Sequence, residues 1–413
     1  MIGHGAKSVG MAGIGIATGH GAESALSNPA MISSVKESEL SASATVFCPT
    51  VNFYSNAKAN AMPRQAAQSK LNYKLSQSAS AIIPDVSYAK RVTPNMIIGL
   101  TVNGTAGMGT DYSKKKYSGA FGMQSSLQIM KVGIPIAYTI PRTQVTLGVA
   151  PILQYSKLNT NYQTQQGMSQ NKKSSSINYG VQVGTVYKHK KLTVGATYQS
   201  KIKANYKGNI SNAMKDFGIK QIKSGDNLDQ PAEIGVGISY KYNNSQIAAD
   251  YKRIQWSKAK GYKDFGWKDQ DVIAVGYEYT QPEFKLRAGY NYAKTPLREK
   301  NAQLAGANGY ENGAINFFNL SGFPGTIEEH YTLGADYKIT DSLDFNVAYV
   351  YSPTVTTSYD TTGMTKGMIM QGALAQGATM QEAQQAANNA KDSSANVEHT
   401  QQALIVGVNY KFQ

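Results

Sequence analysis

The chain has 413 residues, enough for two or three soluble domains or for one large β-barrel. It carries 41 Lys and Arg against 26 Asp and Glu, a net charge of +15, and its 16% of charged residues is well under the roughly 25% of soluble domains. A single cysteine excludes a disulfide scaffold, and no apolar run reaches the ~18 residues of a membrane-spanning helix, so a large all-β protein remains, either soluble or in an outer membrane.

The first 37 residues are rich in Gly, Ala and Ser and show no sustained period. Met1 to His4 lacks the regions of a secretory signal, so we read Met1 as the start of an expressed chain or of a mature chain whose signal has been removed. A segment of this size before the first strand fits a plug inside a barrel, the alternative being a disordered leader. Asn28 before Pro29 favours a specific turn, which supports the plug.

Period-2 alternation recurs from residue 38 to the end and predicts β-strands. Between Ile234 and Tyr240, for example, the even positions are apolar and end in tyrosine, while the odd positions are Gly or Ser. Tyrosines that close an apolar stripe are typical of membrane barrels, although a soluble sandwich, adhesin or propeller also alternates. We count fourteen such segments, at 38–48, 80–91, 95–104, 127–139, 143–156, 177–188, 191–203, 232–242, 246–257, 271–280, 283–294, 329–339, 342–353 and 397–412.

The joints between these segments alternate between short turns, such as 188–191, and long loops, such as 295–328. This alternation is typical of an outer-membrane barrel, with the short turns on the periplasmic side. An Ala-, Gln- and Met-rich stretch at 361–390 predicts a helical excursion in the last long loop. The sequence therefore predicts an all-β fold: a 14-stranded antiparallel transmembrane β-barrel at 38–413 with an N-terminal plug at 1–37 inside the lumen.

Several blocks resemble the FadL family of outer-membrane transporters, which carry long-chain fatty acids and, in the TodX-like branch, aromatic hydrocarbons. These blocks are Ser27–Ile32, Leu40–Phe53, Ile98–Gly104, Pro231–Gly237, Arg287–Tyr292 and Glu329–Gly334. The resemblance implies a fourteen-stranded barrel with an N-terminal hatch. It also implies release of ligand through a lateral gap beside a kinked third strand.

A lateral gap needs a break in strand pairing, and glycine suits such a bend. The third strand ends in a glycine-rich stretch, and the freed backbone groups need partners from the plug or from water. The alternative is that these glycines only line a crowded lumen or loop. The expected plug and gate residues are Asn28, Pro29, Ala30, Gly104, Gly107 and Gly109.

A fatty-acid carboxylate in a dry site needs a cation or hydrogen-bond donors. The period-2 alternation of side chains along each strand places four cations toward the lumen: Lys131, Lys252, Lys285 and Arg287. Arg287 is the first choice for a headgroup contact, because its planar fork matches a carboxylate. A structural ion pair is the alternative for each of the four.

Apolar ligand contacts are expected from a cluster in an otherwise polar loop, formed by Phe317, Phe318, Leu320 and Phe323. The cluster either contacts the ligand or packs the loop onto the rim. Trp256, near the outer end of its strand, fits the rim, the girdle or the ligand site.

No motif indicates an enzyme, a cofactor, a metal or nucleic acid, and the loop lysines 114–116 and 172–173 point instead to lipopolysaccharide. We therefore expect a monomer that passively transports long-chain fatty acids or related hydrophobic compounds through the outer membrane, binding them in a plugged barrel and releasing them laterally. The alternative is a surface adhesin or receptor anchored by the barrel. A lipid hydrolase is the third hypothesis.

Overall fold

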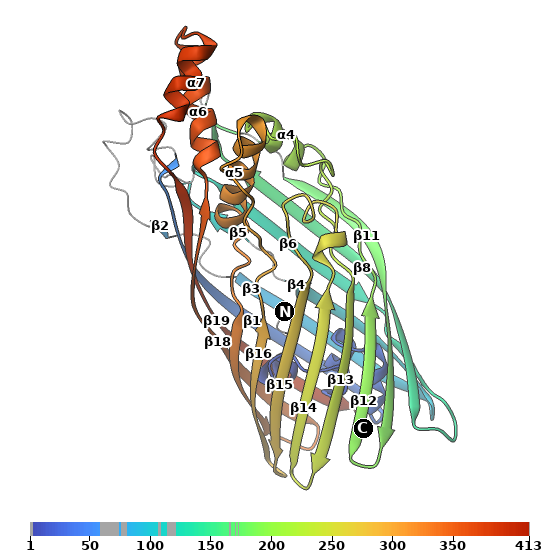
Figure 1. The fold of residues 1–413 in the computed structure, drawn as a ribbon. Helices are drawn as coiled ribbons and strands as arrows, with labels where there is room; N and C mark the ends of the chain where they lie inside the picture. The colour runs from blue at the N-terminus through green and yellow to red at the C-terminus, as the bar shows by residue number, and fades with distance from the viewer. Residues whose placement is uncertain are drawn as a thin grey trace.

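A computed structural model describes residues 3–57, 74–75, 81–105, 109–113, 121–164, 167–169, 171 and 173–412. These residues form a closed, antiparallel barrel of fourteen strands (Figure 1), which confirms the predicted fold class. Pairing between the first and last strands, from Ser38↔Phe412 to Ser55↔Ala395, closes the barrel. The strands are β1 (Ser38–Ser55), β3 (Ala81–Thr93), β4 (Met96–Thr105) with β5 (Gly109–Asp111), β6 (Gln124–Gly133) with β7 (Ile136–Thr139), β8 (Val145–Asn161), β11 (Ser174–His189), β12 (Leu192–Gln199), β13 (Glu233–Tyr242), β14 (Ser245–Ile254), β15 (Gln270–Thr280), β16 (Phe284–Ala293), β17 (Glu329–Lys338), β18 (Leu343–Asp360) and β19 (Ser394–Phe412).

The strands near the chain ends are longer than the sequence pattern predicts. β1 and β18 have 18 residues and β19 has 19, against the ~9–11 residues that cross a bilayer. The extra residues continue the same ladder, as in the pair Thr357↔Val397, and carry the sheet beyond the membrane on the side of the long loops. Short strands β2 (Lys74–Leu75), β9 (Gln163–Thr164) and β10 (Gly167–Met168) lie outside the fourteen.

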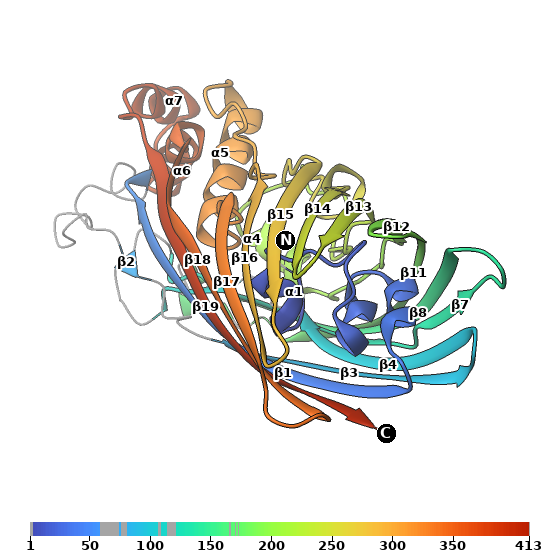
Figure 2. The ribbon, with the colours of Figure 1, turned by 90° about the horizontal axis from the view of Figure 1, so that it is seen from below.

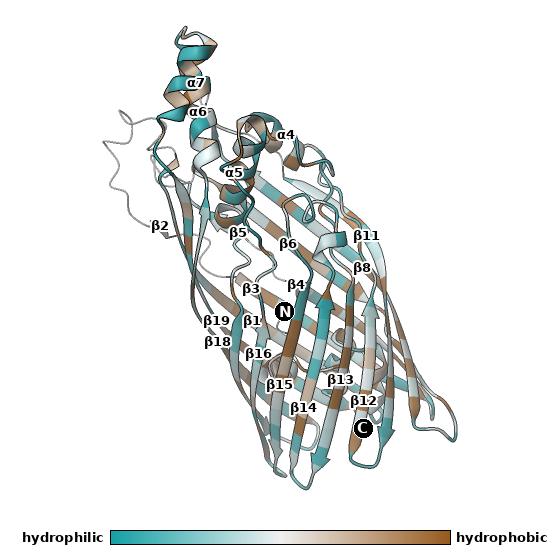
Figure 3. Cartoon of the chain, viewed as in Figure 1, coloured by the Kyte–Doolittle hydropathy of each residue, from teal (hydrophilic) through white to brown (hydrophobic). Residues whose placement is uncertain are grey.

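The apolar stripe of each strand faces outward. In β13, Ile234, Val236 and Ile238 are 44%, 50% and 49% exposed, and the same alternation of apolar and polar bands runs along the other strands (Figure 3). A continuous apolar surface of this kind needs lipid around it. Within the described residues, no helix is both long enough and apolar enough to cross a bilayer.

Helices cover the end of the barrel that carries the long loops (Figure 1). α6 and α7 lie in the stretch 361–390 that the composition predicts to be helical, whereas α4 and α5 lie in loops without a predicted helix. A capping box between Thr379 and Glu382 begins α7. The bounds are α4 (Asn209–Asp216), η3 (Trp256–Lys258), α5 (Gly306–Ser321), α6 (Thr362–Ala375) and α7 (Met380–Asn388).

The N-terminal segment plugs the lumen with α1 (Ala6–Gly10), η1 (Gly21–Leu26) and η2 (Pro29–Ser34) (Figure 2). Its backbone touches glycines of the wall: a Cβ on Gly289 would lie 2.7 Å from the Ala12 nitrogen. Asp250 of β14 accepts the backbone N–H groups of Gly15 at 2.9 Å and Ile16 at 3.0 Å. The glycine-rich inner face is therefore the surface that lets the plug approach the wall.

Candidate functional site

A large apolar cluster lies at the end of the barrel that carries the long loops. It includes Phe53 from β1, Leu158 from β8, Ile210 from α4 and Phe317 from α5. Aromatic rings meet edge to face inside it, with centroids 5.4 Å apart for Phe53 and Phe317. The strands and loops that carry these side chains are far apart in the sequence and meet only because the barrel is closed.

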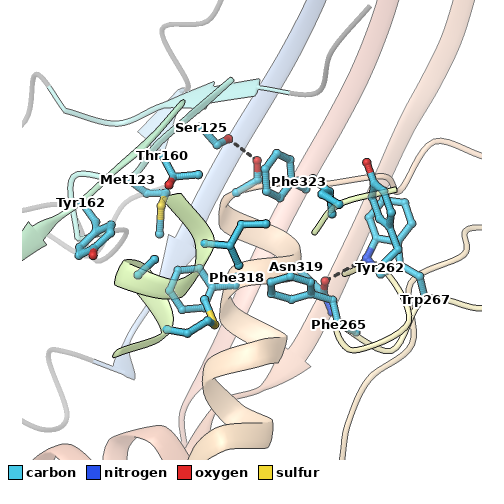
Figure 4. A pocket seen from close by; sticks show the side chains of 15 residues that line it. Met123, Ser125, Thr160, Tyr162, Tyr262, Phe265, Trp267, Phe318, Asn319 and Phe323 are labelled. Carbon is cyan, nitrogen blue, oxygen red and sulfur yellow. Dashed lines mark hydrogen bonds between the residues drawn. The ribbon is translucent and has the colours of Figure 1, made fainter. Parts of the chain in front are cut away.

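A pocket opens within this cluster, with about 620 Å³ of space when its mouth is included (Figure 4). Its exposed lining is almost entirely apolar, and none of its lining residues carries a formal charge. The lining residues are Met123, Ser125, Thr160, Tyr162, Ile210, Ala213, Met214, Leu228, Tyr262, Phe265, Trp267, Phe318, Asn319, Gly322 and Phe323.

Helix α5 forms one wall of the pocket, and two asparagines fix its position. Asn316 accepts the backbone N–H of Lys300 at 2.8 Å and donates to the carbonyl of Asp360 at 2.9 Å. Asn319 accepts the indole N–H of Trp267 at 3.1 Å and donates to the Phe265 carbonyl at 2.9 Å. These side chains tie α5 to the segment before it, to the end of β18 and to the loop that carries Phe265 and Trp267, and they present Phe318 to the pocket.

A second wall is a compact aromatic group beside α5. The ring centroids of Trp256 and Tyr262 are 4.6 Å apart, and Trp267 lies 5.0 Å from Trp256 and 4.8 Å from Tyr262. Burial raises the pKa of Tyr262, so its hydroxyl stays neutral at physiological pH. The wall therefore offers ring faces and edges rather than charge to a ligand.

Polar atoms at the pocket bond to protein groups. The Ser125 hydroxyl donates to the Gly322 carbonyl, and the Tyr162 hydroxyl donates to Asp216 at 2.7 Å. Such groups are satisfied by the protein, so an apolar molecule can bind without leaving them unpaired.

The predicted aromatic contacts lie in this region with different roles. Phe318 and Phe323 line the pocket, whereas Phe317 and Leu320 are 0% exposed behind it. Trp256 stands behind the lining and donates its indole N–H to Gln270 at 3.3 Å. The sequence reasoning missed Tyr262, Phe265 and Trp267. Their signal was four aromatic residues between 256 and 267 in an otherwise polar joint.

The four predicted cations lie in the barrel wall and do not line the pocket. Arg287 donates to both oxygens of Asp336, at 2.5 and 2.7 Å, and to Glu278 at 2.7 Å. Lys285 pairs with Glu278 at 3.4 Å. Lys252 reaches the Gly13 carbonyl of the plug, and Lys131 reaches Gln199, both at 3.5 Å. The geometry of Arg287 favours the structural ion pair over the headgroup contact.

Asn28 holds the plug together and attaches it to the wall. Its side-chain oxygen accepts the N–H of Ala30 at 3.0 Å, which caps η2 directly before Pro29. Its amide donates to the Ile16 carbonyl at 2.8 Å and to Thr185 of β11 at 3.4 Å. Asn28 thus lies beside β11 and not beside the third strand, where the sequence reasoning expected it to cap a freed backbone.

The third strand is interrupted. β4 ends at Thr105 and β5 begins at Gly109. Gly104 is the next-to-last residue of β4, and Gly107 lies outside the described residues. Pairing between β3 and β4 ends at Asp85↔Asn103, although β3 extends to Ala81. Residues 81–84 of β3 and 104–105 of β4 are therefore not paired with one another, although 81–84 pair with β1 and 104–105 pair with β6, and they form a seam in the described wall.

Side chains cover this seam on both surfaces. A Cβ on Gly104 would lie 2.8 Å from Cγ2 of Ile83, so Ile83 fills the seam, while Ile82 is 75% exposed on the outside. Pro84 has no N–H to donate across it. On the inside, His4 of the plug lies 3.4 Å from Asp85. The seam is thus closed by contacts between side chains rather than by strand pairing.

The wall of this barrel faces lipid, its lumen is plugged, and an uncharged pocket lies under its loops. Together these features define an outer-membrane barrel that transports hydrophobic compounds. The sequence model of the family described as outer membrane protein transport protein (OMPP1/FadL/TodX) matches residues 3–305. The chain belongs to this family, whose members are transporters and not enzymes.

Relatives and solved structures agree with this assignment. Outer membrane protein P1 of Haemophilus influenzae is 21% identical over 378 residues, with 78% of each chain covered. The 47 kDa outer membrane protein of Pasteurella multocida is 22% identical, covering 78% of this chain and 79% of the relative. The fold is similar to that of a Pseudomonas aeruginosa FadL homologue (TM-score 0.68, 14% identity) and of the Pseudomonas putida toluene transporter TodX (TM-score 0.66, 17% identity), each covering 100% of this chain and 99% of the other.

The lysines that the sequence reasoning assigned to lipopolysaccharide are largely outside the described residues. This applies to positions 114–116 and to Lys172, whereas Lys173 is exposed directly before β11. Contact with lipopolysaccharide, like the monomeric state, stays a prediction.

Proposed function

We propose that this protein carries small, uncharged hydrophobic molecules through the outer membrane and binds them first in the pocket beside α5. The observation that carries this proposal is the lining, in which none of the 15 residues is charged. A carboxylate buried there would have no cation beside it, which is strongly unfavourable. Neutral aromatic and aliphatic hydrocarbons are therefore the preferred class, ahead of ionised fatty acids.

The names of two structural neighbours support this choice. The Pseudomonas putida TodX and Ralstonia pickettii TbuX structures are described as toluene transporters. Trp267, Tyr262 and Phe318 would contact an aromatic ring by edge-to-face and stacked contacts, each contributing about 0.5–1.5 kcal/mol beyond area burial.

Intrinsic fluorescence tests the binding step directly, because the chain has two tryptophans: Trp267 lines the pocket, and Trp256 packs against Trp267. In an uncharged detergent, toluene should change the emission saturably, and octanoate at pH 8 should do so at least tenfold more weakly than octane. Ala213→Phe, which fills the pocket, should weaken the response at least tenfold. The matched control Ala375→Phe, at the exposed end of α6, should not; equal responses in both variants would refute the pocket as the binding site.

We further propose that bound molecules leave sideways into the bilayer through the seam between β3 and β4. The missing backbone pairing above Asp85↔Asn103 supports this route, because only side chains need to move to open it. A molecule that passes through the wall never crosses the polar headgroup layer or the periplasm. Ile83 is then the residue whose displacement opens the seam.

A disulfide across the seam tests this route. In a Cys48→Ser background, Ile83→Cys with Gly104→Cys places two thiols where the native Cγ2 and a Cβ lie 2.8 Å apart. The oxidised protein should bind toluene normally but stop delivering it to cells, and reduction should restore delivery. Tyr88→Cys with Leu100→Cys, at a position where β3 and β4 already pair, is the control. Undiminished delivery by the oxidised seam variant would rule out this route.

A further inference from the structure

We propose that the periplasmic rim from β3 to β14 binds the headgroups of anionic phospholipids. Charge is distributed unevenly among the short turns. The turns of this arc, together with residues 36–37 directly before β1, carry eight cations and one carboxylate, a net charge of 8 − 1 = +7. The cations are Lys36, Lys90, Arg91, Arg142, Lys188, Lys190, Lys191 and Lys241, and the carboxylate is Glu37. On the arc from β15 to β19 the balance is 3 − 3 = 0: Lys285, Lys338 and Lys411 against Glu283, Asp341 and Asp344.

The two arcs also differ in how their charges are paired. On the β15–β19 arc, Lys338 meets Asp341 at 2.5 Å and Lys411 meets Asp344 at 2.6 Å. On the basic arc, no carboxylate of the described residues lies within 4.0 Å of any of the eight cations. The nearby Glu39 faces into the lumen, where it pairs with Lys7 of the plug at 3.7 Å. The basic arc therefore lacks anions that the other arc supplies from its own turns.

Three of the cations gather at the inner edge of this arc. Lys188 is close enough to Lys241 and Arg91 for mutual repulsion. Arg91 donates to the carbonyls of Ser33 at 3.1 Å and Val35 at 2.6 Å, which fixes its position but leaves its charge uncompensated. Like charges held together in this way create a positive potential that favours an anion with several oxygens.

The membrane interface lies at the same level. Tyr187, Tyr240 and Tyr242 point outward and are 44%, 49% and 58% exposed, as in the aromatic girdle of a barrel. The Lys191 ammonium lies 4.6 Å from the centre of the Tyr242 ring. The lysines are therefore at the height of the lipid phosphates, and basic residues at this level recognise anionic headgroups. A lipid phosphate fits the observations better than a soluble partner, because the cations and the girdle belong to the same turns.

Native mass spectrometry of the full chain tests the proposal. The protein in an uncharged detergent is equilibrated with equal amounts of dioleoyl phosphatidylglycerol and dioleoyl phosphatidylcholine, and the retained lipids are counted. We expect phosphatidylglycerol to be enriched about tenfold at low salt, and the enrichment to fall when NaCl is raised to 0.5 M. Lys188→Gln, Lys190→Gln, Lys191→Gln and Lys241→Gln together should abolish it, with Arg91 kept because it holds the plug.

The matched control neutralises paired charges on the other arc, Lys338→Gln with Lys411→Gln, and should keep the preference. Equal retention of both lipids by the native protein would overturn the proposal. So would loss of the preference in the control as well, or its persistence in the quadruple variant. If inorganic phosphate at equal concentration displaced phosphatidylglycerol, the site would be one for free phosphate and not for lipid. If the preference for phosphatidylglycerol persisted at 0.5 M NaCl, an electrostatic site would be excluded, even if the quadruple variant failed to fold.

Discussion

The side-chain amide of Asn319 joins two walls of the pocket, because its oxygen accepts the indole N–H of Trp267 at 3.1 Å while its nitrogen donates to the Phe265 carbonyl at 2.9 Å. Asn319 is 2% exposed and Trp267 is 3% exposed, so neither group has water as a substitute partner. One polar residue thus determines the distance between α5 and the aromatic loop. Ligand binding should depend on this residue although it contributes little apolar surface.

Asn319→Leu should loosen the pocket. The substitution leaves a buried N–H and a buried carbonyl without partners, at a cost of about 1–3 kcal/mol each. We expect a shift of the tryptophan emission and a loss of toluene binding of about tenfold or more, measured by fluorescence titration. Asn312→Leu removes one exposed hydrogen bond from the same helix and serves as the control. Normal toluene binding by Asn319→Leu would show that the amide does not hold the walls.

Arg287→Met should destabilise the barrel without weakening the binding of acids more than that of neutral compounds. The substitution leaves Asp336 and Glu278 as buried charges without their cation, which typically costs about 3–5 kcal/mol. The thermal midpoint in detergent should fall, and adding Asp336→Asn and Glu278→Gln should recover most of it. Octane and octanoate binding should change to the same extent; a selective loss of octanoate would instead support the headgroup contact.

Glu23 should make the plug sensitive to pH. Burial raises the pKa of Glu23 to about 7 from an ordinary 4.5, although Lys7 and the Ser8 N–H oppose the shift. Because the folded pKa is raised, the stability contributed by neutral Glu23 is present below about pH 4.5 and is lost as the pH rises through about 7. The full effect is roughly 3 kcal/mol at most.

The measurement is the thermal midpoint at pH 5.5 and pH 8.5. The native protein should lose more stability between these values than Glu23→Gln, which stays neutral throughout. Parallel pH profiles of the two proteins would contradict the assignment.

Gly184→Leu should displace the plug and open the barrel to water. A Cβ at this position of β11 would collide with the Asn28 side-chain oxygen, and the longer side chain would reach Pro29. Conductance in planar bilayers should rise several-fold, because the plug no longer fills the lumen. Gly372→Leu, on α6 with nothing within 4 Å of the added Cβ, is the control and should leave conductance unchanged. A closed channel in Gly184→Leu would mean that the plug tolerates a shift at this contact.

Strand positions and their outward faces follow directly from the sequence, because side chains alternate with a period of two and a membrane barrel exposes every second one to lipid. Ile234 and Val236 illustrate this rule. The ends of the longest strands do not follow from it. Residues 354–360 of β18 lie outside the bilayer, where their polar composition no longer reveals a strand, and pairing with β19 decides their conformation.

The sequence by itself determined the barrel, the plug and an apolar element around Phe318, since each depends on residues adjacent in the chain. Only the tertiary structure decided that Arg287 meets Asp336, 49 residues away, and that Trp267 of one loop and Phe318 of another line the same pocket. Contacts between distant residues depend on strand order, register and barrel closure, which no local pattern specifies. For this reason the wall was predictable, while the pocket and the seam emerge from the assembled molecule.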